Sequence, residues 1–344
     1  MGVNVAAVEV ETHDDGLRVS WSLVADHGEG PADGPGAHPS PATGPDAAVD
    51  IAVGPTPDHI DHTHVLRAEP DVRRVVLRDL GPGRHYVSVS PSAGGSAVVA
   101  AERRVAFEGV RNFRDLGGYP TAAGGRTRWG RVFRADALGQ LTVTDLAAYE
   151  QLGLRAVFDL RGDRERLDDP NPVESRHLAF SQPHDERPDL SLLQTHEHGE
   201  RRLAGQYVDI LETVAPSIGE LLANLVDPGG LPAVFHCAGG KDRTGLAAAL
   251  LLSTLGVDRG TVLDDYELTG RFRTIEHEPQ LVATLVGIGF GRPAIGGMMG
   301  TPRWAMAGAL DHLDQHHGGV EPYLIGPAGL DPEVIDELRH TLVV

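Results

Sequence analysis

The sequence of 344 residues predicts a small all-β sandwich domain over residues 1–105, followed by an α/β domain over residues 106–344 whose central, mostly parallel sheet is flanked by helices. Three observations lead to this prediction. Apolar and polar residues alternate with period two in several short segments of the first hundred residues. Later segments alternate between strand-like and helical periodicity, which implies parallel strands joined by crossovers. The chain is also long enough to bury two separate cores.

The first hundred residues contain a series of candidate strands bounded by turn residues. They are residues 3–10, 17–23, 48–53 and 72–77, and the strand up to residue 89 that follows the turn at residues 80–83. Trp21 is predicted to lie in the core, and Tyr86 stands where a tyrosine corner is expected. These features resemble a fibronectin type III-like sandwich, which implies an accessory domain of that fold. Residues 26–46 are rich in Gly, Pro and Ala and are predicted to form a flexible loop inserted between two strands.

Three histidines, His59, His62 and His64, lie close together in the sequence. Metal binding is one interpretation and a solvated loop is the other. Their spacing matches no known carboxylate-and-histidine site, so we favour the solvated loop. Residues 195–198 and 316–317 contain further histidines, which are weaker metal candidates still.

Helix signals begin soon after the first unit. Thr142 and Asp145 form a capping-box-like start for a helix that ends near Gly153. Residues 203–225 are helical by periodicity, and Pro216 is predicted to kink or split that helix.

Two more helices are predicted near the C-terminus, over residues 302–316 and 332–340. Each has proline in its first turn, with Thr301 and Asp331 as the N-caps. Residues 287–299 are rich in glycine and apolar residues. They are interpreted either as a lid or apolar contact surface, or as an ordinary loop.

The stretch around the single cysteine combines a strand, a tight loop and a helix. Residues 231–235 are typical of a short buried strand, and residues 244–252 of a helix that Gly256 can stop. Two glycines between them allow backbone amides to turn inward around an anion, next to a helix N-terminus. Cys237 stands at the loop entrance and Arg243 six residues later. A thiolate is a strong nucleophile and a guanidinium can hold a phosphoryl group with two hydrogen bonds, so the stretch predicts a cysteine phosphatase.

Cys237 is the only cysteine of the chain and Lys241 its only lysine, while the other 29 basic residues are arginine. A small buried apolar residue is the structural alternative for Cys237. His236, the two glycines, Arg243 and Thr244 argue for the catalytic interpretation. The lone lysine indicates that a compact, flexible ammonium suits this position. It either meets a second anionic group on the substrate or pairs with an acid and tightens the loop.

The pattern His-Cys-x5-Arg-Thr-Gly at residues 236–245 resembles the signature of the protein tyrosine phosphatase superfamily. Its second half, Gly-Lys-Asp-Arg-Thr-Gly, is similar to the bacterial tyrosine and phosphoinositide phosphatases of the mycobacterial secreted type. The resemblance continues in other segments and covers most of residues 108–344. These segments are Asn-Phe-Arg-Asp at residues 112–115 and residues 131–136, 156–161 and 265–269. It implies a tyrosine-phosphatase-like catalytic domain over residues 106–344.

The resemblance implies hydrolysis of phosphomonoesters in two steps through a phosphocysteine. Cys237 attacks in line, Arg243 and the loop amides hold the phosphoryl oxygens, and Thr244 hydrogen-bonds the sulfur. The predicted substrate-binding residues are His236, Ala238, Gly239, Gly240 and Lys241. Neither a metal nor another cofactor is predicted, because the guanidinium and the amides supply the positive field. The predicted substrate is phosphotyrosine, with phosphoserine and phosphothreonine as an extension.

A general acid must protonate the departing oxygen. Many tyrosine phosphatases supply it from a Trp-Pro-Asp loop, and none of the three tryptophans here is followed by Pro-Asp. Asp242 is the first candidate, because the resembling bacterial enzymes carry an aspartate at that place. Asp189 is the second, and it lies in residues 171–200, a polar, proline-bearing segment predicted to be a mobile cover. Asp159 and Asp163 are predicted to be structural partners of nearby arginines.

Three alternative functions stay open. A phosphoinositide or inositol phosphate substrate is the main one, because lysine-bearing loops in lipid phosphatases resemble this loop. A rhodanese-type sulfurtransferase also uses a cysteine loop, but Arg243, Thr244 and Lys241 favour phosphate. A catalytically silent phosphate-binding module is disfavoured, because Cys237, Asp242 and Arg243 are all present.

The composition limits the classes of partner that the protein is expected to bind. The net charge of −19 argues against a nucleic-acid partner, since nucleic acids are bound by basic faces. Residues 101–136 hold eight arginines against four acids, which either draw an anionic substrate or form structural ion pairs. No run of 18 apolar residues exists, so no transmembrane segment is predicted. The N-terminus lacks the basic region of a signal peptide, and the protein is predicted to be cytoplasmic, or exported without a cleaved signal peptide. The sequence makes no prediction of oligomeric state.

Overall fold

The computed structural model describes residues 2–13, 16–25, 45–81, 83–180 and 189–344. The chain divides into two compact units, Met1–Val105 and Ala106–Val344. Residues 26–44 of the predicted flexible loop and residues 181–188 of the predicted cover lie outside the described residues. Within the described ranges, no helix is both long and apolar enough to span a membrane.

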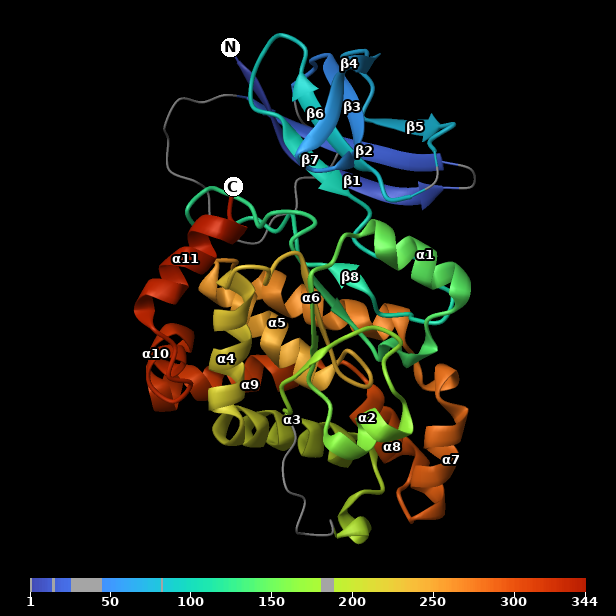
Figure 1. The fold of residues 1–344 in the computed structure, drawn as a ribbon, viewed down its shortest axis with the longest axis vertical. Helices are drawn as coiled ribbons and strands as arrows, with labels where there is room; N and C mark the ends of the chain where they lie inside the picture. Colours follow the sequence, from blue (N-terminus) through green and yellow to red (C-terminus); the bar gives the residue numbers. More distant parts are fainter. Residues whose placement is uncertain (1, 14–15, 26–44, 82, 181–188) are drawn as a thin grey trace. The chain divides into compact units, whose positions relative to one another are not determined.

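The first unit is built from two antiparallel sheets (Figure 1). One has three strands in the order β1-β2-β5 and the other has four in the order β4-β3-β6-β7. The strands are β1 Val3–His13, β2 Gly16–Ala25, β3 Val49–Thr56, β4 His59–Ala68, β5 Arg74–Arg78, β6 Tyr86–Pro91 and β7 Val98–Ala101. Alternate residues of β2 are buried, among them Val19, Trp21 and Leu23, as a period-two pattern requires. The predicted strands and the core position of Trp21 are confirmed.

The histidine segment at residues 59–64 is part of a strand, so its prediction as a loop is wrong. Strand β4 pairs only with β3 at the edge of its sheet, and its side chains are almost all exposed. An exposed edge strand needs no apolar alternation, and the sequence pattern therefore looked like a loop. His64 pairs with Asp61 at 2.8 Å, and the described residues form no metal-ligand group at this position.

The second unit contains a five-stranded sheet in the order β11-β10-β12-β9-β8. The strands are β8 Arg114–Asp115, β9 Val132–Ala135, β10 Ala156–Asp159, β11 Arg176–His177 and β12 Ala233–His236. All pair in parallel except β8, which is antiparallel to β9. Strand β12 lies between β10 and β9 and is buried along its whole length. The mostly parallel α/β prediction is confirmed for this unit.

Helices surround this sheet and make up most of the rest of the unit (Figure 1). The helices are α1 Val143–Gln151, α2 Asp163–Asp168, α3 His196–Thr213, α4 Ala215–Val226, α5 Asp242–Thr254, α6 Arg259–Phe272, α7 Pro279–Gly287, α8 Arg292–Met299, α9 Arg303–His317, α10 Val320–Ile325 and α11 Pro332–Leu342.

The helix boundaries test the capping predictions. Thr142 and Asp145 form the predicted capping box of α1. The predicted long helix is split into α3 and α4, with Pro216 in the first turn of α4. Asp331 caps α11 as predicted, because its side chain accepts a hydrogen bond from the Glu333 amide. Thr301 is not the cap of α9: the N-cap is Pro302, one residue later.

Most of the glycine-rich segment 287–299 is helical, so its interpretation as an ordinary loop is wrong. It contains α8, which packs against α3. An added Cβ would lie 2.0 Å from the Ala294 carbonyl oxygen at Gly199, and 2.2 Å from the His196 carbonyl oxygen at Gly297. The glycines therefore allow two helix backbones to approach closely. Their low helix propensity does not indicate this packing role.

Removal of the residues before Glu102 is expected to leave the second unit folded and active, because its core and its candidate catalytic residues all lie beyond that point. Circular dichroism, thermal unfolding and turnover of an aryl phosphate would check this. A soluble truncated protein that has lost its activity would show that the first unit shapes the site.

Candidate active site

The loop between β12 and α5 turns its carbonyl groups away from its own centre. The Ala238 carbonyl accepts from the Ala137 amide at 3.1 Å and from Arg273 Nη1 at 3.0 Å. The carbonyls of Gly239 and Gly240 accept from Asn112 Nδ2 at 3.1 and 3.0 Å. In a trans peptide the N–H points opposite to the C=O of the preceding residue. The amides of residues 239–241 therefore face the interior of the loop, as an anion cradle requires.

Gly240 is required by its surroundings. Its φ is +63°, in the left-handed region. A Cβ built there would lie 2.6 Å from the Ala135 carbonyl carbon and oxygen and 2.6 Å from the Asp136 amide. Those atoms are backbone and cannot move aside. Strand β9 thus supports the loop from outside, and a side chain at Gly240 would push the two apart.

A buried ionic group also holds the loop in place. Asp265 accepts from Arg114 Nε at 3.1 Å, from Arg134 Nη1 at 2.5 Å and from the Tyr119 hydroxyl at 2.8 Å. Arg134 also donates to the Gly240 carbonyl at 2.7 Å. Burial, together with the nearby Arg114 charge, lowers the pKa of Arg134 to about 10, so the guanidinium stays charged at neutral pH. Two of the eight arginines in residues 101–136 are therefore structural ion-pair partners.

Cys237 follows the last residue of β12 and is buried beside its histidine neighbour. Asn171 Nδ2 lies 3.1 Å from His236 Nε2, and an amide nitrogen can only donate, so Nε2 accepts. His236 Nδ1 then carries the proton and donates to the Cys237 carbonyl at 3.2 Å. Burial lowers the pKa of His236 to about 4, which keeps the ring neutral. His236 therefore positions the backbone of the cysteine and adds no charge.

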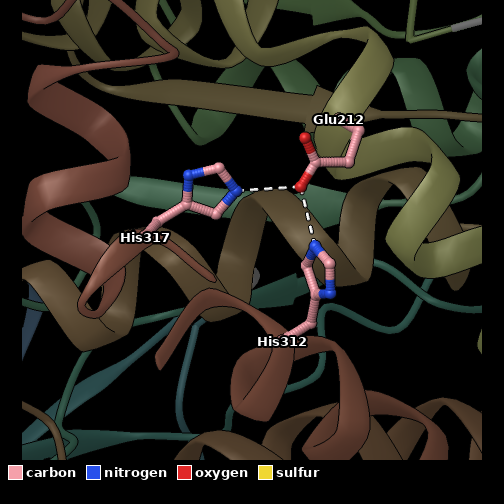
Figure 2. A group of neighbouring side chains, drawn as sticks. All are labelled: Glu212, His312 and His317. Atoms are coloured by element: carbon pink, nitrogen blue, oxygen red, sulfur yellow. Dashed lines mark hydrogen bonds and ion pairs between the residues drawn. The ribbon is translucent and has the colours of Figure 1, made fainter. Parts of the chain in front are cut away.

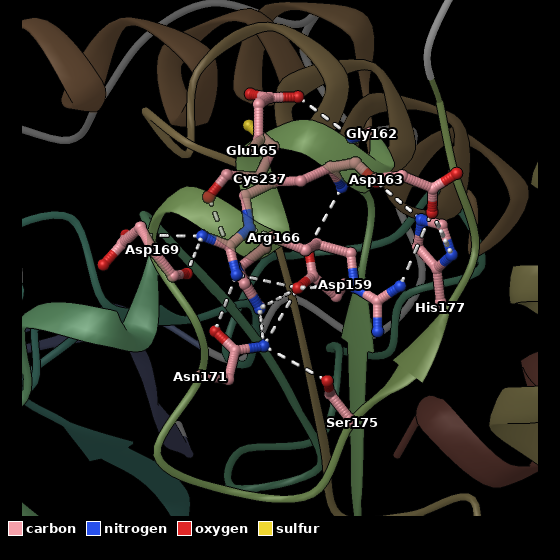
Figure 3. A network of polar contacts seen from close by, with 12 residues as sticks. Asp159, Gly162, Asp163, Glu165, Arg166, Asp169, Asn171, Ser175, His177 and Cys237 are labelled. Carbon is pink, nitrogen blue, oxygen red and sulfur yellow. Dashed lines mark hydrogen bonds and ion pairs between the residues drawn. The ribbon is translucent and has the colours of Figure 1, made fainter.

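A polar network fixes Asn171 in this orientation (Figure 3). Its Nδ2 lies 3.0 Å from Asp159 Oδ2 and 3.2 Å from Ser175 Oγ. Arg161 donates to Asn171 Oδ1 at 3.0 Å and forms a buried ion pair with Asp159 at 2.8 Å. Asp163 lies 3.8 Å from Arg166 Nη1. Asp159 and Asp163 thus have arginine partners, as the sequence predicts.

Arg243 is held by an acid that the sequence analysis missed. Its Nη1 and Nη2 donate to the two oxygens of Glu165, on α2, at 2.6 and 2.7 Å. Burial opposes the charged state, but these hydrogen bonds and the charge of Cys237 outweigh it and raise the pKa of Arg243. Two of the five guanidinium protons are used, which leaves three for a phosphoryl group. The pair sets the plane of the guanidinium before substrate arrives.

Asp242, the first residue of α5, is held by a tyrosine from α3. The Tyr207 hydroxyl donates to Asp242 Oδ1 at 2.7 Å, and the Tyr266 hydroxyl lies 2.7 Å from that of Tyr207. Burial and the nearby Asp242 raise the pKa of Tyr207 well above its usual value, so the phenol stays protonated and acts as a donor. Tyr207 was not predicted, and only its place on the helix that packs against α5 could have indicated it.

Lys241 points away from the loop centre. Its ammonium donates to the backbone carbonyls of Met298 and of Gly300, the latter at 3.1 Å, at the C-terminal end of α8. It also lies 3.3 Å from Asp242 Oδ1. Cationic side chains stabilise helix C-termini in this way.

Two other predicted site residues are Thr244 and Asp189. Thr244 Oγ1 is buried and has no hydrogen-bond partner among the described residues, so its expected bond to the sulfur is not formed in this structure. Asp189 is exposed on the described edge of the predicted cover and does not line the pocket around Cys237.

The pocket above the cysteine has a volume of about 240 Å³. The loop supplies Cys237, Lys241, Asp242 and Arg243 together with Ala238 and Gly239. Much of the remaining wall is apolar and comes from α3, α7 and α8: Leu203, Leu281, Leu285, Met298 and Met299. A polar cavity of about 590 Å³ shares Ala238 and Arg273 with it. The site therefore combines an anion cradle with a hydrophobic wall.

A cysteine at the end of the central parallel strand, an arginine six residues later and inward-facing amides between them define a cysteine phosphatase. The chain belongs to the tyrosine phosphatase family, whose model matches residues 105–344.

Three relatives are similar to the chain. A triple specificity protein phosphatase, PtpB of Mycobacterium tuberculosis, is 26% identical over 280 residues, which cover 68% of this chain and 97% of that protein. A protein named as a tyrosine-protein phosphatase from Cupriavidus necator is 27% identical over 242 residues, covering 69% and 88% of the two chains. A tyrosine-protein phosphatase of Nostoc commune is 29% identical over 220 residues, covering 61% and 73%.

Glu165→Gln is expected to lower kcat/KM on an aryl phosphate by about tenfold to a hundredfold, because the neutral amide no longer holds the Arg243 guanidinium with two charged hydrogen bonds. Steady-state kinetics would measure the change. Glu150→Gln, at an exposed position of α1, is the matched control and should leave kcat/KM unchanged. A fall of less than about twofold for Glu165→Gln would show that Arg243 is positioned without this acid.

Proposed function

We propose that the protein hydrolyses phosphotyrosine and related phosphomonoesters through a phosphocysteine intermediate, without a metal ion. The observation that carries this proposal is the outward anchoring of the loop carbonyls, which turns the amides of residues 239–241 inward. Cys237 and Arg243 line the same pocket. This arrangement stabilises the three equatorial oxygens of a transferring phosphoryl group.

The reaction proceeds in two displacements. The Cys237 sulfur forms a bond to phosphorus while the bond from phosphorus to the ester oxygen breaks, and the general acid protonates that oxygen. Water then attacks the phosphorus of the phosphocysteine and gives a proton to the carboxylate of the general acid, while the sulfur leaves as a thiolate. Thr244 is proposed to rotate its hydroxyl toward the sulfur in this step, since its oxygen has no other partner among the described residues.

Asp242 is proposed as the general acid. It lines the pocket that contains Cys237, and the Tyr207 hydroxyl holds one of its oxygens. The alternative acid, Asp189, would have to approach from the exposed segment next to residues 181–188.

The apolar wall supports an aryl ester as substrate. Leu203 and Leu281 belong to a set of side chains that would contact a phenyl ring whose phosphate occupies the loop. The name of the Mycobacterium tuberculosis relative, a triple specificity protein phosphatase, supports a substrate range that extends beyond phosphotyrosine. The adjoining polar cavity of about 590 Å³ supports the second candidate, an inositol phosphate or phosphoinositide, because it offers space beside the loop for further phosphate groups.

The N-terminal unit is proposed to be a fibronectin type III-like sandwich with an accessory role. Its three-stranded and four-stranded sheets, in the orders β1-β2-β5 and β4-β3-β6-β7, support this fold, as does the buried Trp21. Arg84 donates to the Tyr86 hydroxyl at 2.8 Å, which holds the tyrosine at the start of β6.

Cys237→Ser is expected to abolish turnover and to leave binding of vanadate or phosphate largely intact, because a hydroxyl is a poor nucleophile but the cradle remains. Turnover of p-nitrophenyl phosphate and a vanadate titration would measure the two effects. Residual turnover within about tenfold of the wild type would rule out the cysteine mechanism.

Asp242→Asn is expected to lower kcat on alkyl phosphates far more than on p-nitrophenyl phosphate, because a leaving group that departs as a stable anion needs little protonation. Asp189→Asn serves as the comparison and should show no such dependence on the leaving group. If the two variants exchange these patterns, Asp189 is the acid.

Lys241→Met distinguishes the two roles of the lysine. Its contacts with Met298, Gly300 and Asp242 support the loop-tightening role, for which kcat/KM should fall by a similar factor on phosphotyrosine and on a polyphosphorylated inositide. A second-anion role predicts a fall of about tenfold or more, about 1.4 kcal/mol, on the inositide alone. Parallel kinetics on the two substrates would decide between them.

A further inference from the structure

A second group of polar side chains lies between the C-terminal parts of α3 and α9 and takes no part in the site described above. It consists of Glu212 on α3 and of His312 and His317 on α9. None of the three lines the pocket around Cys237. Figure 2 shows both imidazole rings pointing at the same carboxylate oxygen of Glu212 from two directions.

The ligand atoms of this group already converge. His312 Nε2 lies 2.7 Å and His317 Nε2 lies 2.8 Å from Glu212 Oε1. The potential ligand atoms of the three residues all lie within 4.8 Å of one another. A tetrahedral zinc ion with bonds of about 2.0–2.1 Å needs ligand atoms about 3.3–3.5 Å apart. Small rotations of the three side chains would therefore admit the ion.

The rings are held in place by aromatic neighbours. The His312 ring stacks on that of His316, with centroids 4.2 Å apart, and the His317 ring packs on Tyr323 at 5.3 Å. The two histidine side chains are only 18% and 17% exposed, while that of Glu212 is 48% exposed. The group is thus ordered on its inner side and open to solvent on its outer side, where an ion can enter and a water can complete its coordination.

The backbone also fixes both sides of the group. Helix α9 ends at His317, because Gly318 adopts a left-handed φ of 80° at its C-cap. On the other side, the Tyr323 hydroxyl donates to the Leu211 carbonyl at 2.6 Å, next to Glu212. A site whose ligands sit on rigid helix ends loses little entropy when the ion binds.

We propose that Glu212, His312 and His317 form a structural zinc site that fastens α3 to α9. Two imidazoles and one carboxylate are a donor set that zinc accepts, whereas Mg²⁺ and Ca²⁺ prefer oxygen ligands throughout. Helix α3 also carries Tyr207, which holds Asp242, and Leu203, which lines the pocket. The ion would stabilise the helix that supports the active site, and the chemical steps at Cys237 would proceed without it.

Zinc binding should be measured on untagged, full-length Cys237→Ser protein, in which the one thiolate that could compete for zinc is absent. After removal of metals, titration with Zn²⁺ against a chromophoric chelator is expected to give one equivalent bound with a Kd of about 1 μM or below. At about a hundredfold excess over Kd, Zn²⁺ should raise the Tm by about 5–10 °C, and Mg²⁺ should not.

His312→Gln and His317→Gln are each made in the Cys237→Ser background. Loss of a hydrogen-bond partner of a metal ligand typically lowers metal affinity by about tenfold to a hundredfold, so loss of a ligand itself should weaken Zn²⁺ binding by more than that. His340→Gln, at an exposed position of α11, is the matched control and should bind as the parent does. The proposal would be overturned by equal affinity of the parent and the His312→Gln and His317→Gln variants, or by a parent Kd above about 100 μM. The three residues would then form only a hydrogen-bonded contact between α3 and α9.

Co²⁺ provides a readout that does not depend on the stability of the variants. The parent is expected to develop saturable visible absorption typical of four-coordinate Co²⁺ at one equivalent, and excess Zn²⁺ should remove it. A spectrum indistinguishable from that of aqueous Co²⁺ would overturn the proposal even if a histidine variant failed to fold.

Discussion

The buried charges around Asp265 decide the shape of the catalytic loop. Arg114 and Arg134 are fully buried, and the carboxylate of Asp265 is their shared anion. Arg134 also donates to the carbonyl of Gly240, and Asn112 donates to the carbonyls of Gly239 and Gly240. Removing one partner of such a buried ionic group typically costs about 3–5 kcal/mol, so the arrangement is tightly coupled. Because the carbonyls are held outward, the amides face inward, where they can bind an anion. The nearby functional groups lie around this anion-binding position.

Helix α3 is the element on which several parts of the second unit converge. Near its start, Gly199 allows α8 to approach closely, which brings Met298 and Met299 to the pocket wall. In its middle, Tyr207 donates to Asp242. Near its end, Glu212 meets the two histidines of α9. The three contacts lie on one helix, and Tyr207 connects that helix to Asp242 at the start of α5.

His236, Arg243 and Lys241 have separate roles in the electrostatics of the loop. His236 is kept neutral by burial, so it orients the Cys237 carbonyl without competing with Arg243 for the phosphoryl group. Arg243 keeps its charge because Glu165 offsets the cost of burial. Lys241 places its charge at the C-terminal end of α8. The guanidinium of Arg243 is thus the cationic side chain on the loop that stays available to an anion in the pocket.

The sequence by itself determined the elements that depend on local pattern. The strand, loop and helix around Cys237, the α1 capping box, most strands of the first unit and the parallel sheet follow from periodicity, turn residues and short motifs, which act between near neighbours in the chain. Tertiary structure alone decided which distant groups meet. Glu165 and Arg243 are 78 residues apart, Tyr207 and Asp242 are 35 apart, and Glu212 and His312 are 100 apart. The same holds for the glycines of α8, whose helix propensity predicts a loop although their missing side chains serve close packing. Contacts between distant residues are selected by packing of whole elements, and no local pattern records them.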